Sequence, residues 1–286
     1  SGLSVHSKGA NVLSQRFLDV QLFGRQLEIY STGRGTAQKN LDVEKFRELP
    51  IIIPPFEEQK RIVAVLDAAF EGLTRAKQNA EANLQNAREL FDGIAREIFE
   101  SGENEWPKAT LPKVCEDFGR GKSRHRPRNE ASLYGGAYPF LQTGDLSKAK
   151  QIVDQFSQTY SEKGLAQSKL WPAGTVCIAI VGATIGESAI TAMPSCFPDS
   201  VIGMVPKDEQ ALSAYVQYLL EHYKNDLKAA GEGSARDNIN LATFEDWAFP
   251  MPSVKLQEIV IDRLASASRI SGELMVEYST KIQDIS

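Results

Sequence analysis

The sequence contains few cysteines, and their spacing excludes the sites that cysteines usually build. Cys115, Cys177 and Cys196 are the only three in 286 residues, and they lie far apart. Disulfide frameworks and structural zinc sites need several cysteines, or cysteine and histidine pairs, at short fixed spacings. The three histidines are scattered as well. We therefore expect neither a disulfide framework nor a metal site, and we expect a reducing cytoplasm as the compartment.

Long hydrophobic runs and an excess of positive charge are also absent. No apolar run approaches the roughly 20 residues of a membrane-spanning helix, and the first residues lack the charged-then-apolar pattern of a signal peptide. Hydrophobic residues make up 42% and charged residues 24%, which is typical of a globular chain with room for about two domains. Because the net charge is −5, contact with nucleic acid would require a local basic patch.

The common catalytic signatures are missing too. There is no HExxH motif, no Gly-x-Ser-x-Gly turn and no strand followed by a glycine-rich dinucleotide loop. The segment "GRGKS" is similar to part of a phosphate-binding loop, but Glu116 stands where that signature needs its first glycine. The segment "IIIPPFEEQKRIV" is similar to the Asn-Pro-Pro-Phe loop of adenine methyltransferases, but Ile53 replaces the asparagine that binds the target amino group. We therefore expect no catalytic residues and no bound cofactor in this chain.

What the sequence does contain is an internal repeat. The stretch that starts at Gly33 aligns without gaps on the stretch that starts at Gly231, at a constant offset of 198 residues. Each copy predicts a helix, a glycine-rich loop, a short apolar strand, a proline and a long helix. The matched pairs include Gly33 with Gly231, Gly35 with Gly233, Thr36 with Ser234, Ala37 with Ala235, Asn40 with Asn238, Phe46 with Phe244, Pro54 with Pro252 and Gln59 with Gln257.

Long helices are predicted after both copies of the repeated strand. From Pro55 onward about 44 residues contain no further proline, and Glu57 and Glu58 favour a helix N-terminus there. Apolar residues then recur at heptad spacing, which is typical of a coiled coil. We expect the two helices to pair antiparallel and to hold globular domains at opposite ends, with ordinary core helices as the alternative. The residues predicted to pack between the helices are Ile62, Leu66, Leu73, Leu90, Ile94, Leu264 and Leu274.

Between the two helices, short strand patterns alternate with turns. Examples are "YPFLQTGDL", "GTVCIAIVG" and "SVIGMVP", and the segment closes on the helical pattern "ALSAYVQYLLEHYKNDL". This predicts an α+β fold: a mostly β domain with flanking helices, plus long helices that pair as an antiparallel coiled coil. The expected division is 1–54 for the end of a first domain, 55–102 for the central helix, 103–252 for a complete domain and 253–286 for the second long helix.

Candidate ligand-binding residues gather in three loops. "GRGKSRHRPR" holds five basic residues and no acid, and alternating arginine and lysine on a loop suits contacts to phosphates and guanine. "VGATIGESAI" predicts a tight hairpin with Thr184 at its tip, and "GEGSARDNIN" predicts a polar loop. The alternatives are a solvated basic loop and ordinary turn formers. The DNA-binding candidates are Arg120, Lys122, Ser123, Arg124, Arg126, Arg128, Thr184, Ser234, Arg236 and Asn238.

Taken together, these features resemble the specificity subunits of type I restriction–modification enzymes. The resemblance covers nearly the whole chain and depends on "LPIIIPPFEEQKRIVAVLDAAF", "YPFLQTGDL", "WPAGTVCIAIVGATIGESAI" and the tandem repeat. It implies target-recognition domains that each read half of a split DNA sequence, held apart by helices that dock methyltransferase subunits. It also implies no catalysis in this chain, because S-adenosylmethionine, ATP and Mg²⁺ would be bound by the methyltransferase and restriction subunits.

The chain departs from that family pattern at both ends. Most of a first recognition domain is missing, and the second long helix is shorter than the first. The resemblance therefore implies that residues 103–252 read part of a bipartite double-stranded DNA target, with a homodimer as one way to supply two domains. The alternatives are a truncated regulatory decoy or coiled-coil adaptor that binds the methyltransferase subunit and, against Ile53, an adenine methyltransferase.

Overall fold

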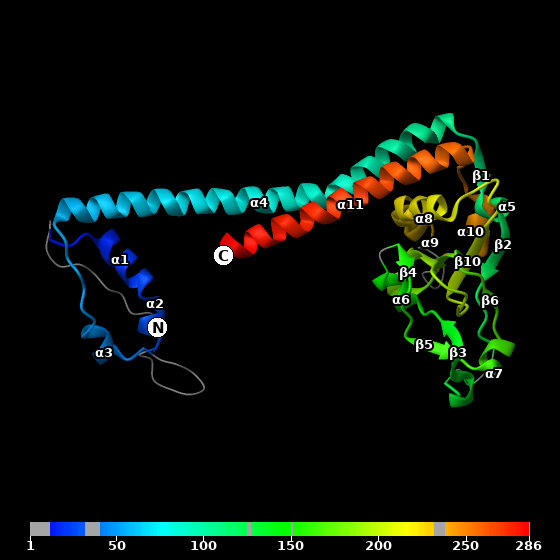
Figure 1. Cartoon of the computed structure of the whole chain (residues 1–286), viewed down its shortest axis with the longest axis horizontal. Helices are drawn as coiled ribbons and strands as arrows, with labels where there is room; N and C mark the ends of the chain where they lie inside the picture. The colour runs from blue at the N-terminus through cyan, green and yellow to red at the C-terminus, as the bar shows by residue number, and fades with distance from the viewer. Residues whose placement is uncertain are drawn as a thin grey trace. The chain divides into compact units, whose positions relative to one another are not determined.

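A computed structural model describes residues 12–31, 41–124, 127, 129–149, 151–231 and 238–285. The chain divides into two compact units, one made of Ser1–Asn83 with Tyr278–Ser286 and the other of Leu84–Glu277. We call them the N-terminal unit and the C-terminal unit and describe each by itself. Figure 1 labels most of the helices and several of the strands.

The N-terminal unit is helical in its described part. Asp42 accepts a hydrogen bond from the backbone N–H of Lys45 at 3.4 Å and so caps a short helix. A much longer helix follows Pro54 and Pro55 and carries two glutamates in its first turn, where the helix dipole favours negative charge. The helices are α1 (Gln15–Gly24), α2 (Gln26–Ser31), α3 (Val43–Arg47) and the first part of α4 (Phe56–Glu105).

The C-terminal unit contains three sheets among its described residues. Their strand orders are β2-β10-β7-β8-β4, β5-β3-β9-β6 and β1-β11. The strands are β1 (Lys108–Thr110), β2 (Cys115–Arg120), β3 (Tyr134–Phe140), β4 (Ile152–Val153), β5 (Gln158–Tyr160), β6 (Leu170–Trp171), β7 (Val176–Ala179), β8 (Ser188–Thr191), β9 (Ser195–Cys196), β10 (Val201–Pro206) and β11 (Ala248–Pro250).

Beside the sheets, the described part of the C-terminal unit contains short helical segments, three further helices and most of the long C-terminal helix. The short helical segments are α5 (Leu111–Val114), η1 (Ala131–Leu133), α6 (Thr143–Lys148), α7 (Glu162–Ala166) and η2 (Gly182–Thr184). The remaining helices are α8 (Ser213–His222), α9 (Lys224–Gly231), α10 (Leu241–Asp246) and α11 (Val254–Ile285). Together with the family comparison given below, this mixture of a β-rich domain and long helices confirms the predicted α+β class.

Both faces of the five-stranded sheet are buried, and β7 shows how. Val176 and Ile178 point to a core shared with helices α4, α8 and α11, whereas Cys177 and Ala179 point to a second core around Trp171. Side chains alternate between the two faces of a strand, so a strand covered on both sides is apolar at every position. The predicted strand "GTVCIAIVG" therefore lies in the middle of the domain.

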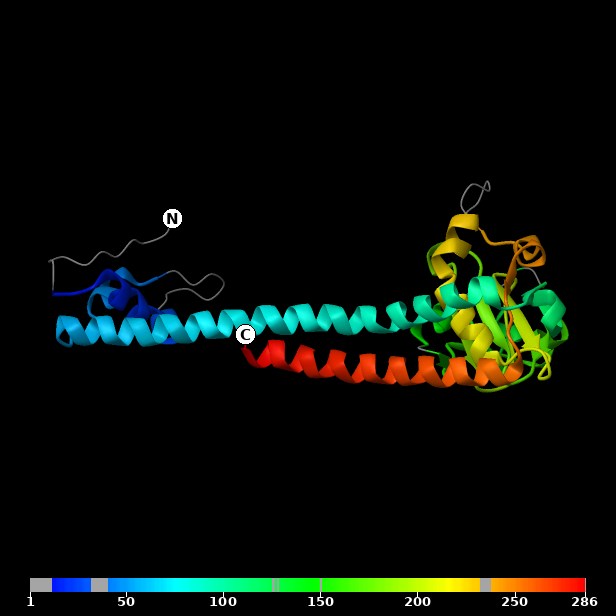
Figure 2. The ribbon, with the colours of Figure 1, turned by 90° about the horizontal axis from the view of Figure 1, so that it is seen from above.

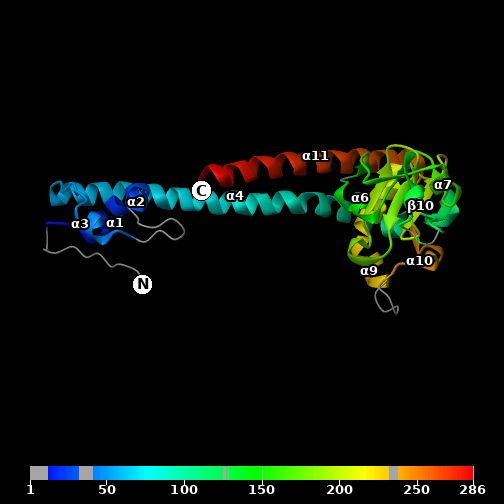
Figure 3. The same ribbon diagram turned by 90° about the horizontal axis from the view of Figure 1, so that it is seen from below.

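Within the C-terminal unit, α4 and α11 run side by side in opposite directions, as Figures 2 and 3 show from above and below. Ser271 Oγ donates to the carbonyl of Ala87 at 2.6 Å, and Arg263 lies 3.8 Å from Glu97. As residue numbers rise along one helix they fall along the other, so the predicted antiparallel pairing is confirmed here. Of the predicted packing residues in this unit, Leu264 is fully buried, and Leu90, Ile94 and Leu274 are half-buried.

One predicted packing residue differs from the expectation. In the N-terminal unit Ile62 and Leu66 are half-buried, but the side chain of Leu73 is 48% exposed. The heptad pattern identified the apolar stripe but could not show how far along α4 the stripe is covered.

The internal repeat is present in the structure, element by element. Helix α1 and helix α8 have the same length and bounds that differ by the repeat offset at both ends. Helices α4 and α11 begin at Phe56 and Val254, which are also equivalent. The caps correspond too, because Asp42 caps α3 and its equivalent Asn240 caps α10 through the backbone N–H of Thr243 at 3.0 Å. The N-terminal unit is thus built like the end of the C-terminal domain.

The two copies differ in what covers the strand before the long helix. In the C-terminal unit this strand is β11, which pairs antiparallel with β1 and buries Phe249 completely. At the repeat offset its equivalent in the N-terminal unit is Pro50–Ile52, and Ile51, Ile52 and Ile53 are 36%, 78% and 52% exposed. No strand pairs with it among the described residues. Side chains from α1 and the turn after it, those of Gln21 and Arg25, hold it through the carbonyls of residues 52 and 50.

Candidate nucleic-acid interface

The predicted DNA-binding loops leave the five-stranded sheet at one end. Arg120, the last residue of β2, is opposite Ile202 of β10, and Ile202 is opposite Ile178 of β7. One step further, the N–H of Gly121 donates to the carbonyl of Val201 at 2.8 Å. The basic loop after β2 and the turn after β7 therefore start side by side, although about 60 residues separate them along the chain.

The third loop joins the same end of the sheet. Asn238 forms an antiparallel bridge with Val181, and the N–H of Ile239 donates to the carbonyl of Ile180 at 3.1 Å. Asn238 is thereby placed beside the turn that carries Thr184. The described end of the third loop thus meets the hairpin and the root of the basic loop at one end of the sheet.

The root of the basic loop is held rigidly. A Cβ atom on Gly121 would lie 2.3 Å from the carbonyl oxygen of Phe197, so only glycine fits at this position. Ser168 Oγ donates to the carbonyl of Lys122 at 2.7 Å, and the hydroxyl of Tyr160 donates to Ser123 Oγ at 3.3 Å. Three consecutive residues are therefore fixed by contacts with other parts of the domain.

These contacts separate the candidate residues into two groups. Gly121 and Ser123 are buried, whereas Lys122 and Arg124 between and after them are exposed, and Arg120 is half-exposed. Ser123 was predicted as a DNA contact, but its hydroxyl is turned inward onto Tyr160. In an extended segment neighbouring side chains point in opposite directions, which accounts for this difference.

The exposed cations at the root of the basic loop are not neutralised by carboxylates of the described residues and can attract an anion. Within the described residues no carboxylate pairs with Arg120, Lys122 or Arg124. Other lysines of the unit are neutralised, for example Lys169 by Asp117 at 2.5 Å and Lys224 by Glu187 at 2.7 Å. Unpaired cations side by side on a fixed backbone attract an anion more strongly than paired ones do.

The turn between β7 and β8 is the tight hairpin that its sequence predicts. Gly182 and Gly186 adopt φ angles of 69° and 84°, which other residues rarely adopt. The amide of Gly186 donates to the carbonyl of Ala179 at 2.9 Å and closes the hairpin. Thr184 lies at the tip, where its hydroxyl contacts the carbonyl of Val181 at 3.4 Å and its side chain is half-exposed.

Asn238 is less suited to contact a base than its position suggests. Its side chain is half-buried, and its Oδ1 atom is buried with no hydrogen-bond partner among the described residues. The acceptor atom that would face an adenine amino group therefore points into the domain. Four further candidates, Arg126, Arg128, Ser234 and Arg236, lie outside the described residues, so for them the assignment stays a prediction.

The structure adds two residues that the sequence did not single out. Asp199 and Ser200 form the turn before β10, and both are half-exposed. The carbonyl of Ser200 accepts from the N–H of Ile180 at 3.0 Å, so this turn lies between the basic loop and the β7–β8 hairpin. No motif marks Asp-Ser as functional, and only the strand pairing reveals its place. A carboxylate here could accept a hydrogen bond from the amino group of cytosine.

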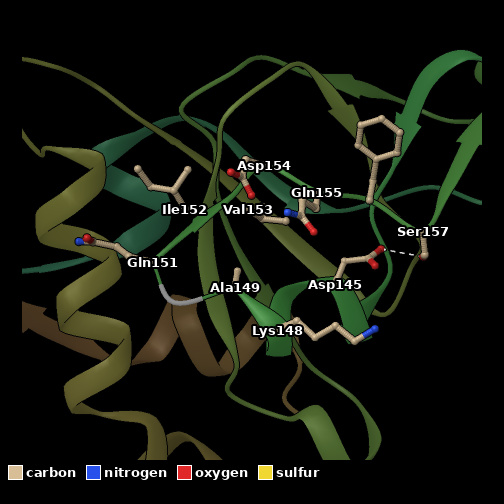
Figure 4. A pocket seen from close by; sticks show the side chains of 10 residues that line it. Asp145, Lys148, Ala149, Gln151, Ile152, Val153, Asp154, Gln155 and Ser157 are labelled. Carbon is tan, nitrogen blue, oxygen red and sulfur yellow. Dashed lines mark hydrogen bonds between the residues drawn. The ribbon is translucent and has the colours of Figure 1, made fainter. Parts of the chain in front are cut away.

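A pocket of the domain with a buried carboxylate serves the fold rather than the candidate interface. The pocket, of about 610 Å³, lies next to β4, and Figure 4 shows its lining. Its buried carboxylate, Asp145, accepts from the N–H of Gln142 at 2.8 Å and from Ser157 Oγ at 3.0 Å and so caps α6. Asp145 is thus committed to the fold, and the pocket offers no cluster of positive charge.

The cysteines are buried and free rather than nucleophilic. Burial raises the pKa of Cys115 and Cys177 to about 12 and also raises that of Cys196. A thiol with such a pKa stays protonated near neutral pH. Over the described ranges, no group of three or more histidine, cysteine, aspartate or glutamate side chains is placed to hold a metal ion. In the same ranges no helix is both long and apolar enough to span a membrane.

Comparison with known protein families identifies the family to which this chain belongs. The family described as type I restriction modification DNA specificity domain matches residues 6–84 and 103–282. The chain belongs to this family. The two matched segments contain the two copies of the repeat, and the resemblance drawn from the sequence is confirmed at the level of the family.

Curated relatives are type I specificity subunits of greater length. The protein named as the MjaX type I restriction enzyme specificity subunit of Methanocaldococcus jannaschii is 24% identical over 253 residues, which are 82% of this chain and 56% of that protein. The HindI specificity subunit of Haemophilus influenzae is 27% identical over 190 residues, which are 63% of this chain and 40% of that protein. The chain therefore spans about half the length of these relatives.

Solved structures share the fold. The HsdS subunit from Thermoanaerobacter tengcongensis superposes with a TM-score of 0.59 at 20% identity, covering 96% of this chain and 70% of that one. A chain from a study of complex assembly and conformational transition of the type I restriction–modification system gives a TM-score of 0.64 at 19% identity, covering 94% of this chain and 65% of that one. At these identities the likeness supports the fold, including the long helices.

Proposed function

We propose that this chain is a DNA-recognition subunit in which the domain of residues 103–252 reads one part of a bipartite duplex target. The observation that carries the proposal is that the described root of the basic loop, the β7–β8 hairpin, the turn before β10 and Asn238 meet at one end of the five-stranded sheet. They bring together the unpaired cations Arg120, Lys122 and Arg124, the hairpin of Thr184 and the turn of Asp199. Cations neutralise phosphates, and the polar turns lie where base edges would follow.

Each group would contribute differently to binding. Lys122 presents a compact charge from a fixed backbone and suits a phosphate, whereas an arginine such as Arg124 can also contact guanine through two parallel hydrogen bonds. The chain has a net charge of −5, so a basic edge on the domain is a local exception to its overall negative charge. A domain with this distribution of charge binds DNA in one orientation, with the basic edge toward the phosphates. Contacts of this kind weaken steeply with salt, because binding releases counterions from the DNA.

The long helices would space the recognition domains and bind the partner subunits. In this proposal α4 and α11 set the distance between recognition domains and dock methyltransferase subunits, with restriction subunits joining the assembly. A groove on the helix pair, lined by Leu90, Ile94 and Ile270, offers an apolar surface for that contact. Catalysis, with its S-adenosylmethionine, ATP and Mg²⁺, would belong to the partner subunits, and the complex would act in the cytoplasm.

The test is a selection of bound sequences from random duplexes at moderate salt, with and without the methyltransferase partner. We expect one enriched half-site motif and an affinity that falls by several orders of magnitude as salt rises. The variant with alanine at Lys122 and Arg124 should lose binding. Lys113→Ala, at an exposed lysine of α5 that precedes β2 at the end of the strand opposite the basic loop, is the matched control and should retain it. Absence of any enriched motif in both conditions would refute the proposal.

The alternative function is a decoy, in which this chain would occupy methyltransferase subunits without completing an active complex. Competition with a full-length specificity subunit separates the two, since a decoy would lower methylation without changing the sequence that is methylated.

A further inference from the structure

A buried glutamine lies at the point where the C-terminal domain meets its long helix. The side chain of Gln257, in the first turns of α11, is completely buried. Its Nε2 donates to the carbonyls of Gln210 and Pro252, both at 2.9 Å, and its Oε1 accepts from the N–H of Leu212 at 2.9 Å. Both donors and one acceptor site of the amide are therefore used.

The same arrangement occurs in the N-terminal unit. Gln59, the repeat equivalent, is also completely buried. Its Nε2 donates to the carbonyls of Val12 at 2.8 Å and Pro54 at 2.9 Å, and its Oε1 accepts from the N–H of Ser14 at 2.9 Å. Each partner is the repeat equivalent of a partner of Gln257, so the three bonds correspond one to one.

The duplication shows that the arrangement does not depend on the β core. The C-terminal copy lies on a five-stranded sheet, whereas the described part of the N-terminal unit has no sheet at all. A buried polar side chain that recurs with all its bonds in two different surroundings is a property of the local joint. Glutamine is also a residue that proteins rarely bury completely.

The bonds connect two parts of the backbone that leave in different directions. Pro252 belongs to the turn between β11 and α11, and Leu212 is the N-cap of α8, which packs on the sheet. In the other unit Pro54 precedes α4, and Ser14 is the N-cap of α1. In both units one amide ties the start of the long helix to the start of the helix that belongs to the domain.

We propose that Gln257 and Gln59 are positioning residues that fix the direction in which each long helix leaves its domain. This rests on the proposed function, where that direction sets the separation of the DNA half-sites. Helix α11 has 32 residues, so at 1.5 Å per residue it is roughly 48 Å long. A change of direction of about 10° would displace its end by roughly 8 Å, which is about two base-pair steps of DNA.

No other side chain replaces the amide. Glutamate has nearly the same shape, but its carboxylate has no donor and would face two carbonyl oxygens. Methionine fills the space but leaves the N–H of Leu212 and two carbonyls without partners. Asparagine keeps the amide but is one methylene too short to reach all three groups. Each change should loosen the joint to a different degree.

The direct test measures a distance within the C-terminal unit. Nitroxide labels on Lys148→Cys and Val276→Cys, both exposed sites, report the distance from the domain to the far part of α11. The native cysteines are buried and should not react. Double electron–electron resonance spectroscopy on the full chain should give one narrow distribution of distances between the two labels. Gln257→Met should broaden or shift it by several ångströms, and Gln257→Asn should do so to a smaller extent.

A matched control separates positioning from stability. Leu141→Ala removes a fully buried side chain from the core on the opposite face of the sheet, away from both long helices. It should lower the melting temperature at least as much as Gln257→Asn and leave the distance distribution narrow. If Gln257→Met does not fold, Gln257→Asn decides the question. An unchanged distribution in the folded glutamine variants would overturn the proposal.

A functional readout follows in the assembled complex. In the selection from random duplexes, the wild type should enrich half-sites at one spacing, and the Gln257 variants should accept spacings that differ by one or two base pairs. If the wild type enriches no motif, the proposed function fails and the distance measurement still stands. If the wild type enriches a motif and the variants keep its single spacing, the positioning proposal fails alone.

Discussion

Replacing Gly121 with alanine should disturb the proposed DNA-binding surface without touching a charged residue. A Cβ atom there would lie 2.3 Å from the carbonyl oxygen of Phe197 and 2.4 Å from that of Pro198, whereas ordinary contact begins at 3.4 Å. The two backbones must therefore separate by about 1 Å. Overpacking of this kind costs about 1–3 kcal/mol, so the melting temperature should fall by roughly 2–12 °C for a unit of this size.

The displacement should also weaken DNA binding. Lys122 follows Gly121 directly and Arg124 lies three residues after it, and the contacts that fix residues 121–123 start from this glycine. A shift of about 1 Å should lower the affinity for the selected half-site about tenfold, which corresponds to about 1.4 kcal/mol. Fluorescence anisotropy with a labelled duplex measures the affinity, and circular dichroism measures the melting temperature.

The same strand offers a matched control. Gly119 lies two residues earlier in β2, and no atom is within 4 Å of the position its Cβ would take. Gly119→Ala should leave DNA affinity unchanged and alter stability by less than about 1 kcal/mol. If Gly121→Ala behaves like Gly119→Ala in both assays, the root of the basic loop is not fixed as described and the reasoning is refuted.

Three further predictions concern charge and ionisation. Lys122→Ala should reduce the slope of log affinity against log salt by about 0.9 and lower affinity similarly for all sequences, and an unchanged slope in anisotropy titrations would remove Lys122 from the phosphate contacts. Burial against Phe99 lowers the pKa of His222. Protonation of His222 therefore favours the unfolded chain, and the free energy of unfolding should fall as pH drops below about 6.5. The melting temperature of the wild type, measured relative to that of His222→Asn, should decrease from about pH 7.5 to about pH 5, and a constant difference would contradict this. The three buried thiols should react slowly with a disulfide reagent at about pH 8, because burial raises the pKa of each; for Cys115 and Cys177 a pKa of about 12 leaves roughly one thiol in ten thousand ionised. Rapid labelling of the folded chain would show that they are accessible.

The organisation of the fold could be predicted because the sequence contains two copies of one structural unit, and a feature present in both copies is supported twice. Two copies at a fixed offset marked the same helix starts, and Pro54 with Pro252 and Gln59 with Gln257 kept their relative positions in the structure. What the copies could not supply was the extent of helix pairing. Leu73 carries the correct heptad position and is nevertheless exposed, because coverage depends on the partner helix and not on the stripe itself.

The candidate site was predictable as residue types and not as an arrangement. Basic and polar loops are visible in a sequence, but their meeting depends on which strands are neighbours, and the order β2-β10-β7 does not follow the chain. For that reason Asp199 and Ser200 were missed. Ser123 was grouped with the basic residues around it, although Tyr160 holds its hydroxyl inward. The burial of Gln257 was equally hidden, since glutamine is usually exposed.

The exposed segment Ile51–Ile53 has a consequence for how the chain behaves at high concentration. A short apolar segment whose backbone is not paired with a strand is a template for strand addition from another molecule. Here the template is limited, because Pro50 and Pro54 have no N–H to donate, and the side chains of Arg25 and Gln21 occupy the carbonyls of Pro50 and Ile52. Association through this edge should therefore stop after one short strand is added and should yield soluble dimers rather than growing fibres.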